Sequence, residues 1–415
     1  MGALRLVFAT AVIFSHAPGL GYGRDYPGVH FSRGQTSLGP MAVCGFFVLS
    51  GLLITRSAQR LSVGRFMWHR LVRIMPAFWL CLAATAFVVA PILAHHERMS
   101  LTHLFDHPRG PWHYIQANWS LGINEWGISD LLGHNIHPGA LDGSLWSLGI
   151  EMLCYLTVAG LAAVGVLRRA RWVVLVLLGA AYLHLFLLAL DYPHLKAPFY
   201  APYQTGWVLP FLGYMSAENV IPLMFIFGLG AAAQLYRDRI PLNAPLALCA
   251  LVAMAVTMRY GAFVLVGVPA FAYLVIWFAL NTPRPLTRIG ARADFSYGIY
   301  IYGYLAQQCL VAFHWNRWGI TTFNAVTVAL TVCAAVVSWY LVEKPALRMK
   351  NLSYDDLGRF RARLVRRRTA ATATTTATAT ATATATTVTV TVPAAVPVPS
   401  PAPAAVVEHE VAAGS

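Results

Sequence analysis

The chain has 415 residues, of which 58% are hydrophobic and 11% charged, and its formal net charge is +14. Soluble domains carry about 25% charged residues, so this composition excludes an ordinary water-soluble globule. The apolar residues fall in blocks of about 20, the length that crosses a hydrocarbon core of about 30 Å.

We predict an all-α polytopic membrane protein with about ten transmembrane helices, both termini in the cytoplasm and a disordered C-terminal tail. Only a tight turn at Arg259-Tyr260-Gly261 separates the seventh helix from the eighth. The ten predicted spans are residues 2–20, 38–57, 75–93, 145–166, 172–190, 218–236, 244–259, 261–280, 294–313 and 321–342.

The basic residues support this topology. With both termini inside, 22 of the 30 Lys and Arg residues fall on the cytoplasmic side, seven fall outside, and Arg5 lies within the first span. This asymmetry follows the positive-inside rule, and an odd number of spans would destroy it. The charge therefore indicates orientation and contact with anionic membrane lipids. We expect no nucleic-acid partner, because no nucleic-acid-binding module accompanies the charge.

The first span carries a cation and an imidazole. Arg5 and His16 are 11 positions apart, which places them within about 20° of the same helix face and about 16 Å apart along the axis. Histidine suits a general base because its ordinary pKa of about 6.5 lies near working pH. The pair indicates a substrate that enters from the cytoplasm and reacts near the outer surface. A snorkelling arginine and a hydrogen-bonded interfacial histidine would give the same spacing.

The second span combines small residues, including Ser50, with an arginine-rich inward connection. Small residues let helices approach closely, so helix packing accounts for them as well as a cavity wall does. The connection from Arg56 to Pro76 contains Arg70 and Arg73, whose guanidinium groups match phosphate oxygens. Because no Walker-type or dinucleotide-binding glycine loop is present, we expect a phosphate-bearing cofactor other than ATP or NAD.

Two outward connections are long. Residues 94–144 contain seven histidines, of which His103 and His107 have the i, i+4 spacing of metal ligands on a helix. We interpret the seven as solvated interfacial histidines and predict no metal site. Residues 191–217 are rich in proline and aromatic residues, and we predict that they roof a substrate cleft.

The fourth span begins with Trp146, and its residues Ser147, Glu151 and Tyr155 share one helix face. An ionisable group inside a membrane is costly and therefore indicates function. We predict that Glu151 lies at a depth similar to His16, where a carboxylate orients an imidazole and stabilises its protonated form.

The ninth span places Tyr297, Tyr300, Tyr304 and Gln308 on one face. These residues predict the wall of a polar cavity, with aromatic packing as the competing interpretation. The tenth span is predicted to stop at Pro345.

The sequence predicts three parts along the chain. Residues 1–348 form the membrane domain, and residues 349–368 a basic juxtamembrane segment that suits an amphipathic helix on the inner leaflet. Residues 369–415 are a low-complexity Ala/Thr/Pro/Val tail with too few large apolar side chains to build a core, and we predict disorder there.

Taken together, these segments resemble the membrane acyltransferase-3 family, which includes O-acetyltransferases of bacterial surface polysaccharides. The family's motifs recur in order as Arg5 with His16, Phe46 to Leu53, Arg70 to Pro76, Trp146 to Glu151, Tyr297 to Tyr300, and Val342 to Pro345. Leu52 stands where the family usually has an aromatic residue. Tyr302-Gly303-Tyr304 stands where relatives often have a histidine, so no catalytic role is carried over to that position.

The resemblance implies a ten-helix enzyme of the bacterial inner membrane that takes an acyl group, usually acetyl, from cytosolic acyl-CoA and delivers it to a hydroxyl of a cell-surface glycan. It implies donor binding by Arg5, Arg70 and Arg73, and catalysis by His16 with Glu151. His16 would deprotonate the acceptor or carry the acyl group transiently. Any further extracytoplasmic step would need a separate partner protein.

Two other interpretations remain open from the sequence. A multi-pass transporter of lipids, glycans or small molecules would also have many helices around a polar cavity, although no clear internal repeat is present. A catalytically inactive relative that senses acyl-CoA or glycan is the third possibility, against which the intact Arg5, His16 and Glu151 argue.

Overall fold

The computed structural model describes residues 1–199, 206–209, 211–290 and 293–351, and every structural statement below concerns these residues. Residues 352–368 of the predicted basic segment and the Ala/Thr tail lie outside them, whereas residues 349–351 are described. The described chain is helical apart from one small hairpin, which confirms the all-α polytopic class.

Every predicted span corresponds to a helix. The first half of the chain contains α1(Gly2–Tyr22), α2(Leu38–Ala58), α3(Val63–Ala84), the π-helical turn η1(Thr85–Val89), α4(Ala90–His96), α5(Leu101–Asp106), α6(Pro111–Asn118), η2(Gly143–Leu145), α7(Trp146–Ala163), α8(Val166–Arg169), α9(Trp172–Leu190) and η3(Pro193–Leu195). The antiparallel hairpin of β1(Gly206–Leu209) and β2(Gly213–Ser216) follows, with Gly206 opposite Ser216 and Leu209 opposite Gly213.

The second half contains α10(Ala217–Leu235), α11(Ala244–Tyr260), η4(Phe263–Gly267), α12(Val268–Asn281), α13(Arg284–Thr287), α14(Ser296–Ala312), η5(Trp315–Trp318), α15(Ile320–Ser338), η6(Trp339–Glu343), α16(Lys344–Arg348) and η7(Met349–Asn351). Gly261 and Ala262 form the predicted turn between α11 and the next helix, and both have positive φ.

Eight helical segments of the described chain are long and apolar enough to cross a membrane. The helices α11 and α14 have 17 residues each and fall just short of that length. Large apolar side chains stay exposed on α9, where Leu183 and Leu187 are 56% and 55% exposed. A soluble surface would not leave such a band uncovered, so these side chains face lipid.

Two predicted boundaries are wrong. Helix α3 begins at Val63, so Arg65, Arg70 and Arg73 lie on a helix rather than in a connection. Helical structure also continues past Pro345 to Arg348. The π-helical turn η6 precedes this proline, and such a turn rearranges the hydrogen-bond ladder into which proline cannot donate.

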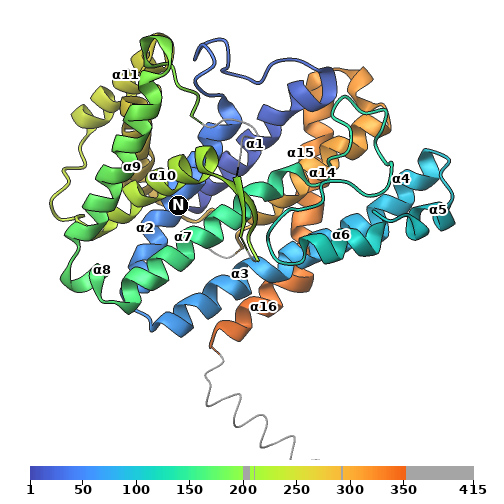
Figure 1. Cartoon of the computed structure of the whole chain (residues 1–415), viewed down its shortest axis with the longest axis horizontal. Helices are drawn as coiled ribbons and strands as arrows, with labels where there is room; N and C mark the ends of the chain where they lie inside the picture. The colour runs from blue at the N-terminus through green and yellow to red at the C-terminus, as the bar shows by residue number, and fades with distance from the viewer. Residues whose placement is uncertain (200–205, 210, 291–292, 352–415) are drawn as a thin grey trace, which may run out of the picture. The chain divides into compact units, whose positions relative to one another are not determined.

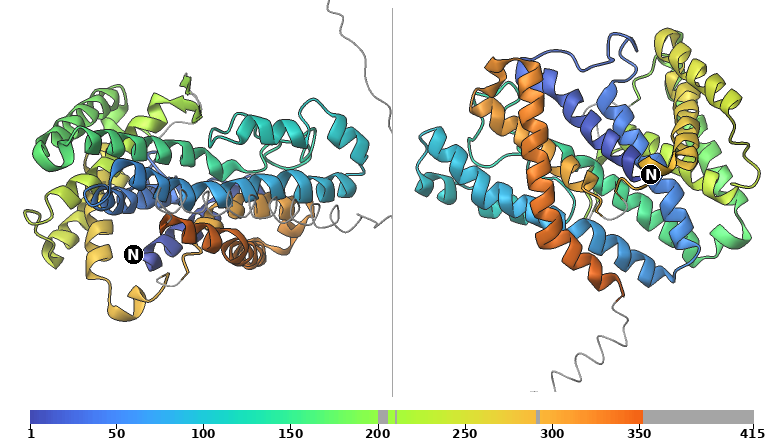
Figure 2. Two further views of the ribbon diagram at one scale, coloured as in Figure 1. Left: turned by 90° about the horizontal axis from the view of Figure 1, so that it is seen from below. Right: turned by 180° about the vertical axis from the view of Figure 1, so that it is seen from behind.

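The N-terminal helix lies at the centre of the packing. Helix α1 packs against α2, α14 and α15, as Figure 1 shows for α14 and α15. The most extensive helix pair is α2 with α10, where Gly51 and Gly230 bring the two backbones together. A Cβ at Gly51 would come within 2.0 Å of the carbonyl oxygen of Phe227. Seen from below, α3 runs as one long helix close to α16 (Figure 2).

Candidate active site

Two cavities open inside the helix bundle, one above the other along α1. The outer cavity, of about 70 Å³, includes His16, Tyr26, Ser144, Trp146 and Phe199 in its wall. The inner cavity, of about 50 Å³, includes Arg5, Arg73, Ser147, Glu151, Tyr155 and Tyr297. Val43 and Tyr300 belong to both walls and therefore separate the two spaces.

This partition is well ordered. The hydroxyl of Tyr300 shares a hydrogen bond of 2.6 Å with Ser147 Oγ, which fixes the ring across the boundary. The ring also packs edge-on against Phe46, with 5.7 Å between centroids. Tyr300 and Val43 are both 7% exposed. Of the face predicted to line a polar cavity, Tyr297 and Tyr300 line the inner cavity, whereas Tyr304 and Gln308 belong to neither wall.

His16 stands in the outer cavity with a free ring nitrogen. Its Nδ1 is buried, and no hydrogen-bond partner is found for it in the described part of the chain. Tyr26 and Tyr304 hold the imidazole edge-on, with ring centroids at 6.1 and 5.4 Å. An imidazole positioned by aromatic contacts, with a nitrogen unoccupied, is suited to accept a proton from a bound hydroxyl.

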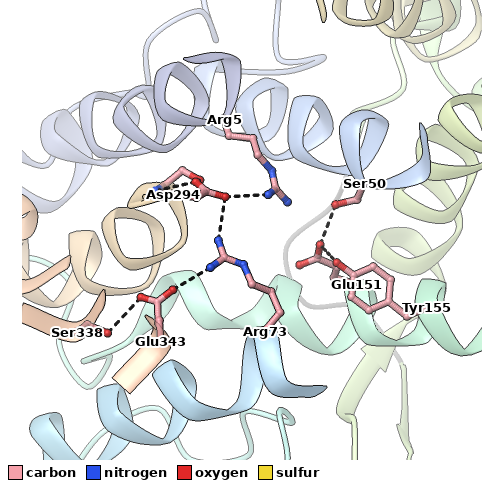
Figure 3. Close-up of polar contacts among 9 residues, drawn as sticks. Arg5, Ser50, Arg73, Glu151, Tyr155, Asp294, Ser338 and Glu343 are labelled. Carbon is pink, nitrogen blue, oxygen red and sulfur yellow. Dashed lines mark hydrogen bonds and ion pairs between the residues drawn. The ribbon is translucent and has the colours of Figure 1, made fainter. Parts of the chain in front are cut away.

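Arg5 and Arg73, in the wall of the inner cavity, belong to a chain of ion pairs (Figure 3). Arg5 Nη1 and Arg73 Nη2 both donate to Asp294 Oδ2, at 3.0 and 2.9 Å. Arg73 Nη1 donates to Glu343 Oε2 at 3.1 Å, and Ser338 Oγ donates to the other Glu343 oxygen at 3.4 Å. These contacts join α1, α3, the segment just before α14, the end of α15 and the π-helical turn η6, so the charges fix the bundle as well as the cavity.

Arg73 is the centre of this network. Besides its two carboxylate partners, its guanidinium lies 5.7 Å from the ring centroids of both Tyr297 and Trp339. Tyr297 in turn donates to the carbonyl of Ile74 at 3.0 Å. A guanidinium packed between aromatic faces and bonded to two acids is rigidly oriented.

Glu151 does not orient His16, which corrects the sequence prediction. Its Oε1 accepts hydrogen bonds from Ser50 Oγ, at 2.9 Å, and from the hydroxyl of Tyr155 (Figure 3). Glu151 lies one helical turn below Ser147, so it faces the inner cavity and not the outer one. The prediction judged depth only from the position of Glu151 along its span.

Arg70 lies on the same helix as Arg73 but has different surroundings. Its guanidinium packs over Phe66 at 5.9 Å, and its buried Nε has no hydrogen-bond partner among the residues that the structure describes. Sequence reasoning grouped three arginines for donor binding. Arg5 and Arg73 form ion pairs within the protein, whereas Arg70 keeps a hydrogen-bond donor without a partner among the described residues.

Sequence reasoning missed Asp294, Glu343 and Val43. Glu343 was noted only as part of the motif that closes the tenth span, and Asp294 only as the first residue of the ninth. A usable signal existed, because both are acids at the ends of apolar segments and such groups need a cationic partner. Nothing in the sequence marks Val43, an apolar residue in an apolar helix.

A buried acid anchors the segment that leads into α7. Asp142, 1% exposed, directly precedes the η2–α7 segment and accepts a 2.6 Å hydrogen bond from the Tyr114 hydroxyl. Burial raises the pKa of Asp142 to about 6, an increase that the hydrogen bond from Tyr114 opposes. Phe199, from the predicted roof segment, also lines the cavity. Gln308 binds the loop carbonyls of His137 and Ala140 and does not line either cavity.

The histidine-rich connection forms no metal site in the described chain. No group of three or more His, Cys, Asp or Glu side chains there has metal-binding geometry. His103 and His107 lie beside Asp130, at 3.7 and 3.9 Å, on an exposed surface.

Comparison with known proteins gives consistent matches. A family model described as an acyltransferase domain matches residues 1–343. The chain is 30% identical over 348 residues to a protein named O-acetyl transferase of Shigella phage Sf6, which covers 82% of this chain and 93% of that relative. It is 28% identical over 370 residues to Nodulation protein 10 of Rhizobium leguminosarum bv. viciae, covering 84% and 92%. No solved structure matches the chain.

Proposed function

We propose that this chain moves an acetyl group from cytosolic acetyl-CoA to a hydroxyl of a cell-surface glycan. The chain belongs to the acyltransferase-3 family and is an acyl-transferring membrane enzyme. The observation that carries the proposal is the pair of adjacent cavities, which share Val43 and Tyr300. One cavity has guanidinium groups in its wall, and the other has an imidazole whose buried Nδ1 finds no hydrogen-bond partner among the described residues. Donor and acceptor thus meet at the partition from opposite sides.

The inner cavity suits the donor. Arg5 and Arg73 present guanidinium groups to it that Asp294 and Glu343 orient, and Arg70 lies on the same helix as Arg73, toward the predicted cytoplasmic end. Guanidinium groups match the phosphates of acyl-CoA. The carboxylate of Glu151 can accept from the amide N–H groups of a pantetheine arm, which lead from the phosphates to the thioester. Acetyl-CoA, or another acyl-CoA, enters here as a donor substrate and no metal is required.

The outer cavity suits the acceptor. Its wall is made of aromatic and hydroxyl side chains, among them Trp146, Tyr26 and Ser144, of the kinds that bind sugars by stacking and hydrogen bonding. His16 accepts the proton of the acceptor hydroxyl as the oxygen attacks the thioester carbonyl. The carbon–sulfur bond breaks, and the CoA thiolate leaves and takes up a proton. In a two-step variant His16 itself attacks the thioester and carries the acetyl group before transfer.

The location proposed for the enzyme is the bacterial inner membrane, surrounded by lipid, with the acceptor delivered at the outer face. A separate extracytoplasmic partner would take over any later step on the glycan. The predicted orientation rests on the basic residues of the inward connections.

Family membership weighs against the transporter interpretation, and one experiment separates all three. Purified protein reconstituted in vesicles with acetyl-CoA inside and the cell's own glycan outside is expected to release CoA and to add an acetyl mass to the glycan. A transporter would move glycan or CoA across the bilayer without forming acetylglycan. An inactive sensor would bind acetyl-CoA without releasing CoA. Either of these results would overturn the proposal.

A further inference from the structure

We propose that Arg70 and Lys350 form a phosphate-binding subsite at the predicted cytoplasmic end of the bundle, where Lys350 is a binding residue that the family motifs do not include. The proposal rests on the proposed function in one respect, because it takes the 3′-phosphate or the pyrophosphate of acyl-CoA as the phosphate in question. The headgroup of an anionic lipid offers the same chemistry, and the test below distinguishes the two.

The first argument is the balance of charge. Arg5 and Arg73 are compensated, because Asp294 binds both guanidinium groups and Glu343 binds that of Arg73. Arg70 has no carboxylate within ion-pair distance in the described ranges, and the same holds for Lys350 there. Two neighbouring half-buried cations without an acid repel each other. An anion bound between them removes this cost, as a phosphate does in other basic sites.

The second argument is that Lys350 is held in place. Residue 350 belongs to the short turn η7, which packs against the first half of α3. The Trp68 indole N–H donates to the carbonyl of Met349 at 3.0 Å, and His69 Nε2 donates to the carbonyl of Lys350 at 3.1 Å. His69 directly precedes Arg70 on α3. Two backbone attachments therefore hold the turn that carries the ammonium group beside the arginine.

The titration behaviour agrees with this geometry. Burial and the nearby charges of Arg70 and Arg73 lower the pKa of Lys350 to about 8. The groups that face the ammonium are thus His69, Arg70 and Arg73. The arginines keep their charge at all working pH values, and a histidine ordinarily titrates near pH 6.5. Above about pH 8, Lys350 is therefore the group that changes, and the subsite loses one positive charge.

The test measures binding of three probes to the full-length protein in nanodiscs made of a zwitterionic lipid. Desulfo-coenzyme A carries all the phosphates, its 3′-dephospho form lacks one, and pantetheine lacks them all. The variants are Lys350→Gln and Lys350→Arg, with Lys344→Gln as the matched control on the adjacent helix α16. Asp355 and Asp356 lie outside the described residues, and their replacement by Asn controls for neutralisation of Lys350 by the chain itself.

Lys350→Gln is expected to weaken desulfo-coenzyme A binding by roughly tenfold or more, since a charge-assisted contact is lost. Pantetheine binding stays unchanged, and Lys344→Gln and the Asp→Asn variant bind desulfo-coenzyme A at least as tightly as the wild type. Between about pH 7 and pH 9 the wild type loses affinity, whereas Lys350→Arg retains it. Equal weakening of all three probes, or no weakening of any, would overturn the subsite.

A second arm uses nanodiscs of anionic lipid. If anionic lipid weakens desulfo-coenzyme A binding to the wild type but not to Lys350→Gln, the subsite stands and its phosphate comes from the lipid headgroup. Failure of the proposed donor has a different signature, namely that the wild type binds none of the probes. Failure of the subsite alone leaves tight coenzyme A binding that is the same in wild type and Lys350→Gln.

Discussion

The two cavities differ in whether their charged and titratable side chains have partners within the protein. The two arginines of the inner cavity both have ion-pair partners. Asp294 binds Arg5 and Arg73, and Glu343 binds Arg73 as well. In the outer cavity the proposed base, His16, keeps a buried nitrogen without a partner in the described chain. The inner wall is built from helices, whereas loops contribute Tyr26, Ser37 and Phe199 to the outer wall.

The difference follows from what each site must do. Permanent charges inside a membrane protein are tolerated only when they are paired, so binding groups there come with built-in partners that a ligand displaces or joins. Burying a neutral imidazole without a hydrogen-bond partner costs far less free energy than burying an unpaired permanent charge. The imidazole can therefore remain without a partner until the acceptor hydroxyl binds. The Val43–Tyr300 partition thus separates the proposed site of donor binding from the proposed site of proton transfer.

The largest effect is expected at His16. His16→Gln keeps most of the volume between Tyr26 and Tyr304 but removes the base, and should lower the rate of acetyl transfer roughly 10²- to 10⁴-fold. Binding of desulfo-coenzyme A, which involves the other cavity, should stay unchanged. Transfer by the variant at the wild-type rate would mean that the outer cavity is not where the proton is taken up, and the contrast between the cavities would fail.

The next effect concerns the inner network. Arg73→Leu leaves Glu343, which is 2% exposed, without its cation, and should reduce the free energy of unfolding by about 3 kcal/mol. Denaturant titration in mixed micelles, followed by circular dichroism, measures the loss. No loss would show that the ion pairs contribute little to stability.

A double variant separates the stabilising role of Arg73 from its binding role. Arg73→Leu with Glu343→Leu replaces the ion pair by apolar side chains and should regain most of the stability, because a buried pair and an apolar pair of similar size are often nearly equivalent. Acetyl transfer should not return. If it does return, Arg73 holds the bundle together and does not bind the donor.

The fold was largely predictable from sequence because lipid imposes a simple pattern. Apolar blocks of fixed length give the spans, and the basic residues give the orientation. The errors fall at the ends of helices that lie near the inner boundary. The segment that contains Arg65, Arg70 and Arg73 was predicted as a loop because these residues are polar, although α3 extends through it as a helix. Pro345 read as a stop, although the π-helical turn before it accommodates the ring.

Sequence reasoning could single out residues of the candidate site but not their pairings. Arg5, Arg73, Glu151 and Tyr300 were each singled out, and all four line the inner cavity; ionisable groups in spans are rare enough to be noticed. The partners of these residues depend on how helices that are distant in sequence pack together. A single sequence does not show that packing. Glu151 was therefore paired with His16 on depth alone, whereas the structure gives it Ser50 and Tyr155.

A smaller effect tests whether the outer wall depends on its loop anchor. Tyr114→Phe removes the hydrogen bond to the buried Asp142 carboxylate, and should lower the free energy of unfolding by about 2 kcal/mol near neutral pH. Because the pKa of Asp142 in the folded protein is about 6, above its ordinary 3.8, the folded state binds more protons between these values. Wild-type stability should therefore fall as pH rises through that interval.

Because Asp142 takes up a proton as the pH falls, the destabilisation caused by Tyr114→Phe should depend on pH. At about pH 5 Asp142 is mostly protonated and needs the Tyr114 donor less, so the destabilisation should shrink there. Tyr260→Phe, at a residue 67% exposed, is the control and should change nothing. A destabilisation by Tyr114→Phe that is equal at both pH values would show that the loss comes from packing rather than from the carboxylate.

The smallest effect is expected at the partition itself, where the two regions meet. Val43→Ala widens the opening between the cavities, and should raise the rate with butyryl-CoA relative to acetyl-CoA by roughly tenfold, the scale on which one or two methylene groups are discriminated. Leu148→Val is the matched control, because Leu148 lines only the inner cavity. If both variants shift the preference equally, the volume of the inner cavity selects the acyl chain, and Val43 and Tyr300 divide the two spaces without gating what passes between them.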